Sequence, residues 1–183
     1  MEASEKVVES YFRYVKKYFT IPNLRCGGQK EIDLIGMRES DGQVLRIHVE
    51  VSVTTSGPFK KINSQPYSET SKKTRSGSAS ERVKIGYFVH SKFNDANVIS
   101  SLRDYGFSGN NYEKVIVAWD WDTSVEPIAA QNGIKLLRFR EILEEMMEVF
   151  GKNESYFSDD TVRLLQLLKK SSTESKDIHK NKN

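Results

Sequence analysis

The stretch that decides the fold is residues 30–53, which read KEIDLIGMRESDGQVLRIHVEVSV. Apolar and polar residues alternate on both sides of Asp41 and Gly42. An Asp-Gly pair between two alternating runs predicts a β-hairpin, because the tight turn needs positive φ angles that these two residue types tolerate. We therefore expect two antiparallel strands joined at this pair.

The hairpin turn also predicts which residues face each other. If Asp41 and Gly42 are the central turn residues, counting outward places Asp33 opposite Glu50. Successive side chains of a strand point to opposite faces of the sheet. One face would then carry the apolar residues Ile32, Leu34, Leu45, Ile47, Val49, Val51 and Val53, and the other would carry Glu31, Asp33, Arg46, His48, Glu50, Ser52 and Thr54. We expect the first face to belong to the core and the second to be polar.

The two facing acids suggest a cation site. Side chains directly opposite each other in a sheet have Cβ atoms about 4.5–5.5 Å apart, so two carboxylates there repel unless a cation lies between them. Oxygen ligands with two negative charges suit a hard divalent cation. Alternatively, both acids face water, where salt screens the repulsion. Ile35 and Met37 share the polar face, which suggests partial cover, and the pattern leaves both interpretations open.

The order of the expected elements indicates the fold class. Helices are predicted at residues 4–19, 94–105, 125–131, 141–150 and 158–170, and strands at 30–40, 43–53, 83–93, 114–121 and 134–140, with a connector or short strand at 23–28. Alternating strands and helices in the second half require parallel pairing there. We expect an α/β fold, a mixed β-sheet flanked by helices on both faces.

Length and composition limit the organisation of the chain. With 183 residues we expect one α/β domain at residues 1–150, a C-terminal helix at 151–170 packed on it, and a disordered polar tail at 171–183. Cys26 is the only cysteine, which excludes an intramolecular disulfide. No apolar run approaches the roughly 20 residues that span a bilayer, and the acidic start lacks a hydrophobic signal segment. We expect a cytoplasmic protein with no membrane partner.

A basic segment follows the hairpin. The net charge is only +3, but Glu69 is the single acid among several basic residues between Gly57 and Ser76. These are Lys60, Lys61, Lys72, Lys73 and Arg75. Positive charge concentrated in this way attracts the phosphates of nucleic acids, although a solvated loop explains it equally well.

Two short motifs in the hairpin resemble a known family. The sequence EIDLI at 31–35 and HVEVS at 48–52 resemble the core of the PD-(D/E)xK nuclease superfamily, in particular its Holliday-junction-resolvase-like and Mrr-like members. The likeness in element order covers residues 1–145. It implies a restriction-endonuclease-like fold, hydrolysis of DNA phosphodiesters with Mg²⁺ or Mn²⁺, and DNA, including branched DNA, as the partner. Many relatives dimerise, which makes a homodimer an expectation of the resemblance alone.

The resemblance also assigns roles to residues of this chain. Asp33 and Glu50 match the two acids of the motif and would bind the metal ion, with the backbone carbonyl of Val51 as a further ligand. Glu9, in the first helix, is the candidate for a third acid. The alternative for Glu9 is an ordinary i,i+4 ion pair with Arg13.

This chain departs from the family at one position. Ser52 stands at the catalytic position where the family has a lysine, and a serine hydroxyl supplies no positive charge. Another cation could take its place, with candidates at Lys30, Lys60, Lys61, Lys72 and Lys73, or activity could be lost. A catalytically inactive nucleic-acid-binding module and a protein–protein interaction domain with solvent-facing acids remain alternatives. His48 lies on the face of Glu50 and could contact a phosphate, or it could be a plain exposed strand residue.

Overall fold

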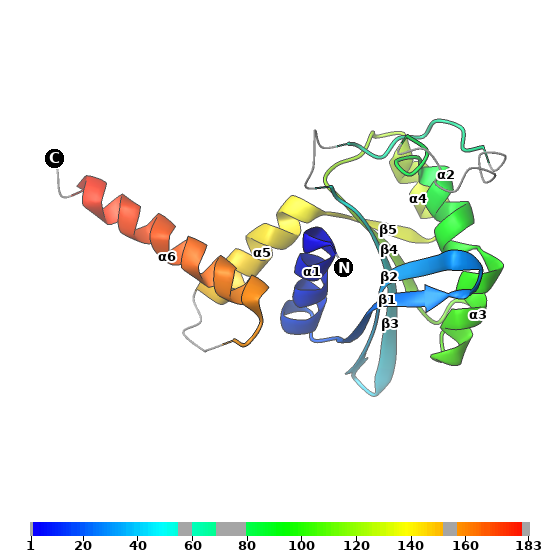
Figure 1. The fold of residues 1–183 in the computed structure, drawn as a ribbon, viewed down its shortest axis with the longest axis horizontal. Helices are drawn as coiled ribbons and strands as arrows, with labels where there is room; N and C mark the ends of the chain where they lie inside the picture. Colours follow the sequence, from blue (N-terminus) through cyan, green and yellow to red (C-terminus); the bar gives the residue numbers. More distant parts are fainter. Residues whose placement is uncertain (1, 55–59, 69–79, 152–156, 181–183) are drawn as a thin grey trace.

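The computed structural model describes residues 2–54, 60–68, 80–151 and 157–180, with side chains up to residue 171. Its centre is a mixed five-stranded sheet in the order β1-β2-β3-β4-β5 (Figure 1). The strands are β1 (Phe19–Cys26), β2 (Lys30–Ser40), β3 (Gln43–Ser52), β4 (Glu113–Ala118) and β5 (Ile134–Arg138). The first three pair antiparallel, and β3, β4 and β5 pair in parallel. The predicted α/β class, with parallel pairing in the second half, is confirmed.

The hairpin of β2 and β3 has the predicted turn and register. Ser40 pairs with Gln43 across the turn, and the ladder continues in the same register to Leu34 and Val49. Asp41 has a φ of 53° and Gly42 a φ of 75°, as the tight turn requires. Asp33 and Glu50, which the motif assigned to the site, are therefore the next two residues beyond the end of this ladder.

Helices cover both faces of the sheet (Figure 1). One face packs against α1 (Ala3–Ser10), its continuation η1 (Tyr11–Val15), α5 (Phe139–Gly151) and α6 (Asp160–Lys180). The other packs against α2 (Ile85–Tyr87), η4 (Phe88–Phe93), α3 (Ala96–Asp104) and α4 (Val125–Gln131). Gly27–Gln29 forms the short turn η2 between β1 and β2. This two-sided cover is the predicted arrangement.

The strand β4 shows why the sheet sits between two cores. Val115 and Val117 pack on the α1 and α5 side, whereas Ile116 and Ala118 pack on the α2 and α4 side. All four are almost completely buried, so β4 is a central strand that is buried on both faces.

The segment 83–93 was predicted to be a strand, and that prediction is wrong. It forms α2 and η4, two short helical stretches that follow each other without a break. Its apolar residues Ile85, Phe88, Val89 and Phe93 are buried on one side, and their spacing of three and four residues is helical. The β-branched and aromatic content of the segment pointed to a strand, but packing against β4 decided the outcome.

Three further differences concern burial and element ends. The hairpin face that we expected to be polar is covered by α3: Ile35 packs there with Val98 and Leu102. The first helix ends at Val15, and Pro22 lies inside β1, which is tolerated because β1 is an edge strand. α6 continues to Lys180, so helix extends into the tail that we expected to be disordered. Over the described ranges, no helix is both long and apolar enough to cross a membrane.

The packing of α5 gives a test of the core. Met146 is completely buried, and Val149 on the same helix is 41% exposed. We expect Met146→Ala to lower the free energy of unfolding by about 2–5 kcal/mol, because it leaves a cavity in the core. Val149→Ala should change it by less than about 0.5 kcal/mol. Urea denaturation measures both, and equal effects would contradict the described position of α5.

Candidate active site

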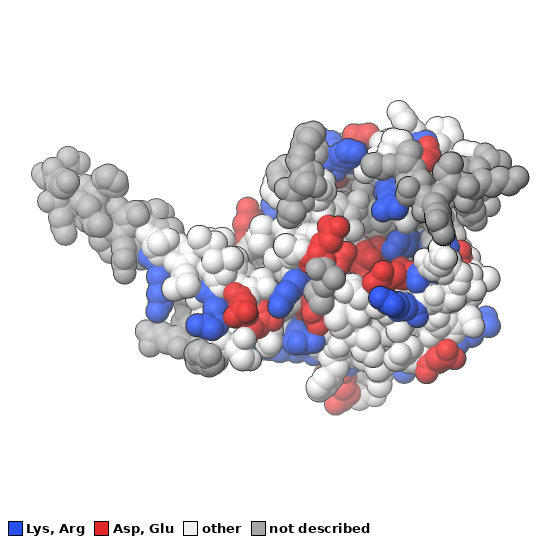
Figure 2. Space-filling view, in the orientation of Figure 1, with Lys and Arg blue, Asp and Glu red and all other residues white. Residues whose placement is uncertain are grey.

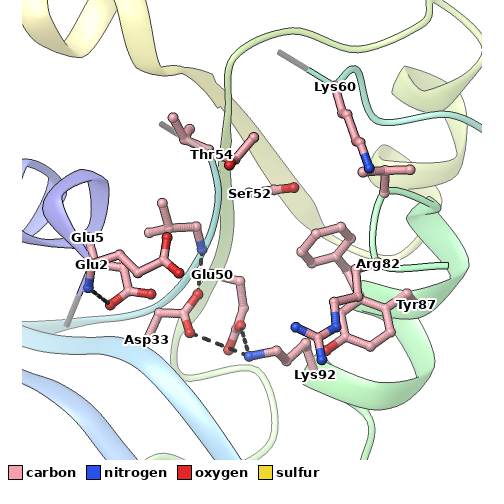
Figure 3. Close-up of a pocket in the computed structure, with 14 residues that line it drawn as sticks. Glu2, Glu5, Asp33, Glu50, Ser52, Thr54, Lys60, Arg82, Tyr87 and Lys92 are labelled. Atoms are coloured by element: carbon pink, nitrogen blue, oxygen red, sulfur yellow. Dashed lines mark hydrogen bonds and ion pairs between the residues drawn. The ribbon is translucent and has the colours of Figure 1, made fainter. Parts of the chain in front are cut away.

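The two motif acids lie side by side where the β2–β3 ladder ends (Figure 3). The Asp33 carboxylate reaches across and accepts a hydrogen bond from the backbone N–H of Val51, with Oδ2 2.7 Å from the nitrogen. The Glu50 side chain is 1% exposed and that of Asp33 is 16% exposed. The structure therefore brings the predicted pair together on one side of the sheet, in a sheltered position.

Lys92 supplies the positive charge between these acids. Its Nζ lies 2.5 Å from Oε2 of Glu50 and 3.4 Å from Oδ1 of Asp33. It also donates to the backbone carbonyl of Glu31 at 3.0 Å. Lys92 belongs to η4, a helical segment on the α3 side of the sheet, and it points back toward the strand ends (Figure 3). A positive charge thus lies beside both acids, on a residue forty positions after Ser52 in the chain.

His48 supports Glu50 from behind. Its ring is completely buried, and Nε2 lies 2.9 Å from Oε1 of Glu50. The ring also packs edge-on against that of Phe93, with 4.8 Å between the two centroids. Burial, reinforced by the charge of Lys92, lowers the pKa of His48 to about 3. When Glu50 is ionised, the neutral ring donates its Nε2–H to that carboxylate. His48 is therefore not an exposed strand residue, and it does not line the pocket that a phosphate would enter.

Burial sets the ionisation of the two acids. It raises the pKa of Asp33 to about 7, helped by the charge of Glu50 and opposed by Lys92. It also raises the pKa of Glu50, against the opposing charge of Lys92. For Lys92, burial favours the neutral amine, but the two carboxylates outweigh it and raise its pKa. The Lys92 ammonium is therefore charged throughout the neutral range. A nearby cation stabilises the ionised form of Asp33 and Glu50, which burial alone disfavours.

A pocket of about 460 Å³ opens in front of the acids. Glu2 and Glu5 line it from the start of α1, and Lys60, Arg82 and Tyr87 line it from the opposite side (Figure 3). Acidic side chains gather at the middle of this face, with basic ones beside them (Figure 2). Residues 51–54 form the floor. The pocket at the end of β3 thus has acidic side chains on one side and basic side chains on the other.

The first helix brings a different acid to the pocket from the one predicted. The Ser4 hydroxyl donates to the carbonyl of Val53 at 2.9 Å, which fixes the start of α1 beside β3 and turns Glu5 toward the pocket. Glu9 lies one turn further on and accepts hydrogen bonds from Arg13 and Thr20. Glu9 therefore takes the i,i+4 pairing that was its alternative, and it is absent from the described pocket lining.

The predicted nucleic-acid-binding residues have mixed positions. Lys60 is exposed and lines the pocket. Lys61 instead pairs with Asp120, with Nζ 3.1 Å from Oδ2. Lys72, Lys73 and Arg75 lie outside the described residues. Ser52 and Val51 both line the pocket, so the position of the absent lysine does face the site.

Sequence reasoning missed Lys92, and one signal could have found it. With Ile85, Phe88, Val89 and Phe93 read as a helical stripe, Lys92 falls on the same stripe, seven residues after Ile85. A lysine on a buried helical stripe needs an acidic partner, and the hairpin acids were the ones that we expected on a partly covered face.

The residues present fit a hard divalent cation. The donors are the carboxylates of Asp33 and Glu50, and Val51, whose carbonyl was the further predicted ligand, lines the same pocket. Oxygen donors are what Mg²⁺ and Mn²⁺ favour while keeping several waters. Within the described part of the chain, no group of three or more His, Cys, Asp or Glu side chains is arranged to hold a metal ion. The site therefore suits an ion that substrate oxygens and water complete, rather than a closed structural metal centre.

Comparisons with known proteins give distant likenesses. No family model and no curated protein matches the chain. A repair endonuclease from Pyrococcus abyssi aligns with 75% of this chain at 10% identity and a TM-score of 0.40. The aligned part is 47% of that protein, so this chain spans about half its length. A protein described as of unknown function aligns over 94% of this chain and 98% of its own, with 13% identity and a TM-score of 0.47. At these scores the likenesses support no statement about activity.

The pKa of Asp33 gives a pH-dependent test of the site. Because its pKa is about 7 in the folded protein and about 3.9 in an unfolded chain, the folded state holds an extra proton between these values. Stability is therefore lost through this group as the pH rises across that window. We expect Asp33→Asn to raise the free energy of unfolding by about 1–3 kcal/mol at pH 8 and to have little effect at pH 4. Thermal unfolding at both pH values measures this, and equal gains at the two would show that burial does not raise this pKa.

Proposed function

We propose that this protein is a metal-dependent nuclease that hydrolyses DNA phosphodiesters. The observation that carries the proposal is the placement of Asp33, Glu50 and Lys92 together in the lining of one pocket. Hydrolysis of a phosphodiester needs a way to hold a divalent ion and a positive charge close to the phosphate. These three side chains combine both requirements within one sheltered group.

The two acids are the proposed metal ligands. Asp33 and Glu50 would hold Mg²⁺ or Mn²⁺, with the carbonyl of Val51 as a further ligand, and Glu5 lies on the same pocket wall. When bound, such an ion polarises the scissile phosphate and lowers the pKa of a bound water. The protein contributes the fixed orientation: Val51 N–H holds Asp33, and His48 holds Glu50.

Lys92 is proposed to do the work of the lysine that Ser52 replaces. Its ammonium, 2.5 Å from Glu50, would face a phosphate in the pocket and stabilise the negative charge that develops during attack. Lys60 and Arg82 line the same pocket and would attract the neighbouring phosphates of a DNA strand. Lys72, Lys73 and Arg75 remain proposed DNA contacts from the segment outside the described residues.

The alternatives predict different behaviour. A protein–protein interaction domain was expected to have solvent-facing acids, whereas Glu50 is completely buried. A non-catalytic nucleic-acid-binding module was an alternative because Ser52 leaves the site without the motif lysine. Lys92 supplies a positive charge beside the two acids, so the missing lysine no longer favours this alternative. Such a module would bind DNA in a salt-sensitive manner without cleaving it in any divalent metal.

A cleavage assay tests the proposed activity. Wild-type protein should nick or linearise plasmid or branched DNA in Mg²⁺ or Mn²⁺. We expect Asp33→Ala and Lys92→Met each to lower the cleavage rate by about 10²–10⁴-fold, because each removes charge aimed at the reacting phosphate. Lys135→Met, on the exposed side of β5, controls for the loss of one positive charge and should leave the rate unchanged. Unaltered cleavage by Asp33→Ala would rule the mechanism out.

Returning the lysine to the strand gives a sharper test. Ser52 lines the pocket, so a lysine at this position would reach the same space from the opposite element. We expect the double variant Lys92→Met, Ser52→Lys to recover about tenfold or more of the activity lost in Lys92→Met. Cleavage rates of the two proteins, measured side by side on one substrate, decide this. No recovery in a folded double variant would contradict the proposed role of Lys92.

A further inference from the structure

The Lys92 ammonium is surrounded by oxygens as a bound cation would be. Three oxygens surround Nζ of Lys92. They are Oε2 of Glu50 at 2.5 Å, Oδ1 of Asp33 at 3.4 Å and the carbonyl oxygen of Glu31 at 3.0 Å. The side chain is only 16% exposed. In this conformation the ammonium lies where positive charge best compensates both carboxylates.

The other oxygen of each carboxylate is already engaged. Oδ2 of Asp33 accepts the backbone N–H of Val51 at 2.7 Å, and Oε1 of Glu50 lies 2.9 Å from Nε2 of His48. Both of these partners are fixed by the sheet. The oxygens that take no part in these two bonds are Oδ1 of Asp33 and Oε2 of Glu50, and these are the two that Lys92 contacts.

A divalent ion and this ammonium cannot share that position. Two positive charges a few ångströms apart in a sheltered site repel strongly, because little water screens them. An ion that takes the two free oxygens must therefore separate Lys92 from them. The four-carbon stem of lysine is flexible, and the pocket of about 460 Å³ beside it, lined by Lys92 itself, offers room for the displaced ammonium.

We propose that Lys92 is a built-in competitor of the divalent ion: it holds the acid pair together in the metal-free protein and leaves the carboxylates when the ion binds. This inference rests on the proposed function for the identity of the ion. It adds a regulation that the nuclease proposal alone does not contain. The bond to Lys92 weakens metal binding, and the released ammonium becomes available to a phosphate in the pocket.

Mn²⁺ binding to purified full-length protein tests the competition. Calorimetry at pH 8 with Mn²⁺ alone should show at least about tenfold tighter binding to Lys92→Met than to wild type, because the competing charge is gone. Lys135→Met is the matched control: it removes an exposed lysine of β5 that lies outside the described pocket lining, and its affinity should stay within about twofold of wild type. Equal or weaker binding to Lys92→Met than to wild type would overturn the proposal.

A second measurement does not depend on any variant being stable. In wild-type protein with isotope-labelled lysines, Mg²⁺ titration should shift the NMR signals of the Lys92 side chain as the ammonium leaves the carboxylates. Lys135, exposed on β5 and outside the described pocket lining, serves as the reference signal that should move little. If Mg²⁺ binds, as seen from the backbone signals of Asp33 and Glu50, while the Lys92 signals stay in place, the competition does not occur.

These results separate the competition from the nuclease activity. Tighter Mn²⁺ binding by Lys92→Met, in a protein whose wild type cleaves no DNA, would support the competition and refute the proposed function. Cleavage by wild type together with unchanged Mn²⁺ affinity in Lys92→Met would support the nuclease and refute the competition.

Discussion

The structure depends on one electrostatic constraint, which is the placement of two carboxylates beside each other in a sheltered position. Taking an ion out of water costs several kcal/mol even after the protein relaxes. Asp33 and Glu50 meet that cost through Lys92, whose ammonium contacts both. The strand ends and the helical segment that carries Lys92 must therefore meet at this point, and the arrangement of the α3 side of the sheet follows from it.

The surroundings of Lys92 show how the fold meets this constraint. Phe88 and Phe93, at the two ends of η4, are buried against the sheet, and the hydroxyl of Ser91 lies 2.7 Å from that of Tyr67. η4 is a π-helix, which has wider turns than an α-helix, and such turns are rare and occur often at functional sites. Here the segment keeps its apolar residues in the core while its lysine reaches the strand ends. Packing and charge compensation thus support the same backbone path.

The sequence predicted the features that local rules determine. The turn at Asp41 and Gly42 fixed the register of the hairpin, and the register brought Asp33 to Glu50. The unpredicted features depend on contacts between distant segments. Lys92 was hidden because its segment has strand-like residue types in a helical conformation, and Glu5 reaches the pocket only because Ser4 binds Val53. The full burial of His48 likewise required the cover of Phe93, which no local pattern of the hairpin encodes.

The absence of the motif lysine at Ser52 is therefore weak grounds for assigning an inactive protein. The proposed phosphodiester hydrolysis requires a positive charge close to the phosphate, and it does not require that charge at a given position in the chain. A lysine on β3 and a lysine on η4 approach the acids from opposite sides, yet both end in the same pocket, which Ser52 and Lys92 line together. A lysine on β3 and a lysine on η4 differ in which groups the ammonium contacts when no metal ion is bound. Lys92 reaches the free oxygens of both acids, so in this chain the residue that would assist the reaction is also the one that an incoming ion must displace.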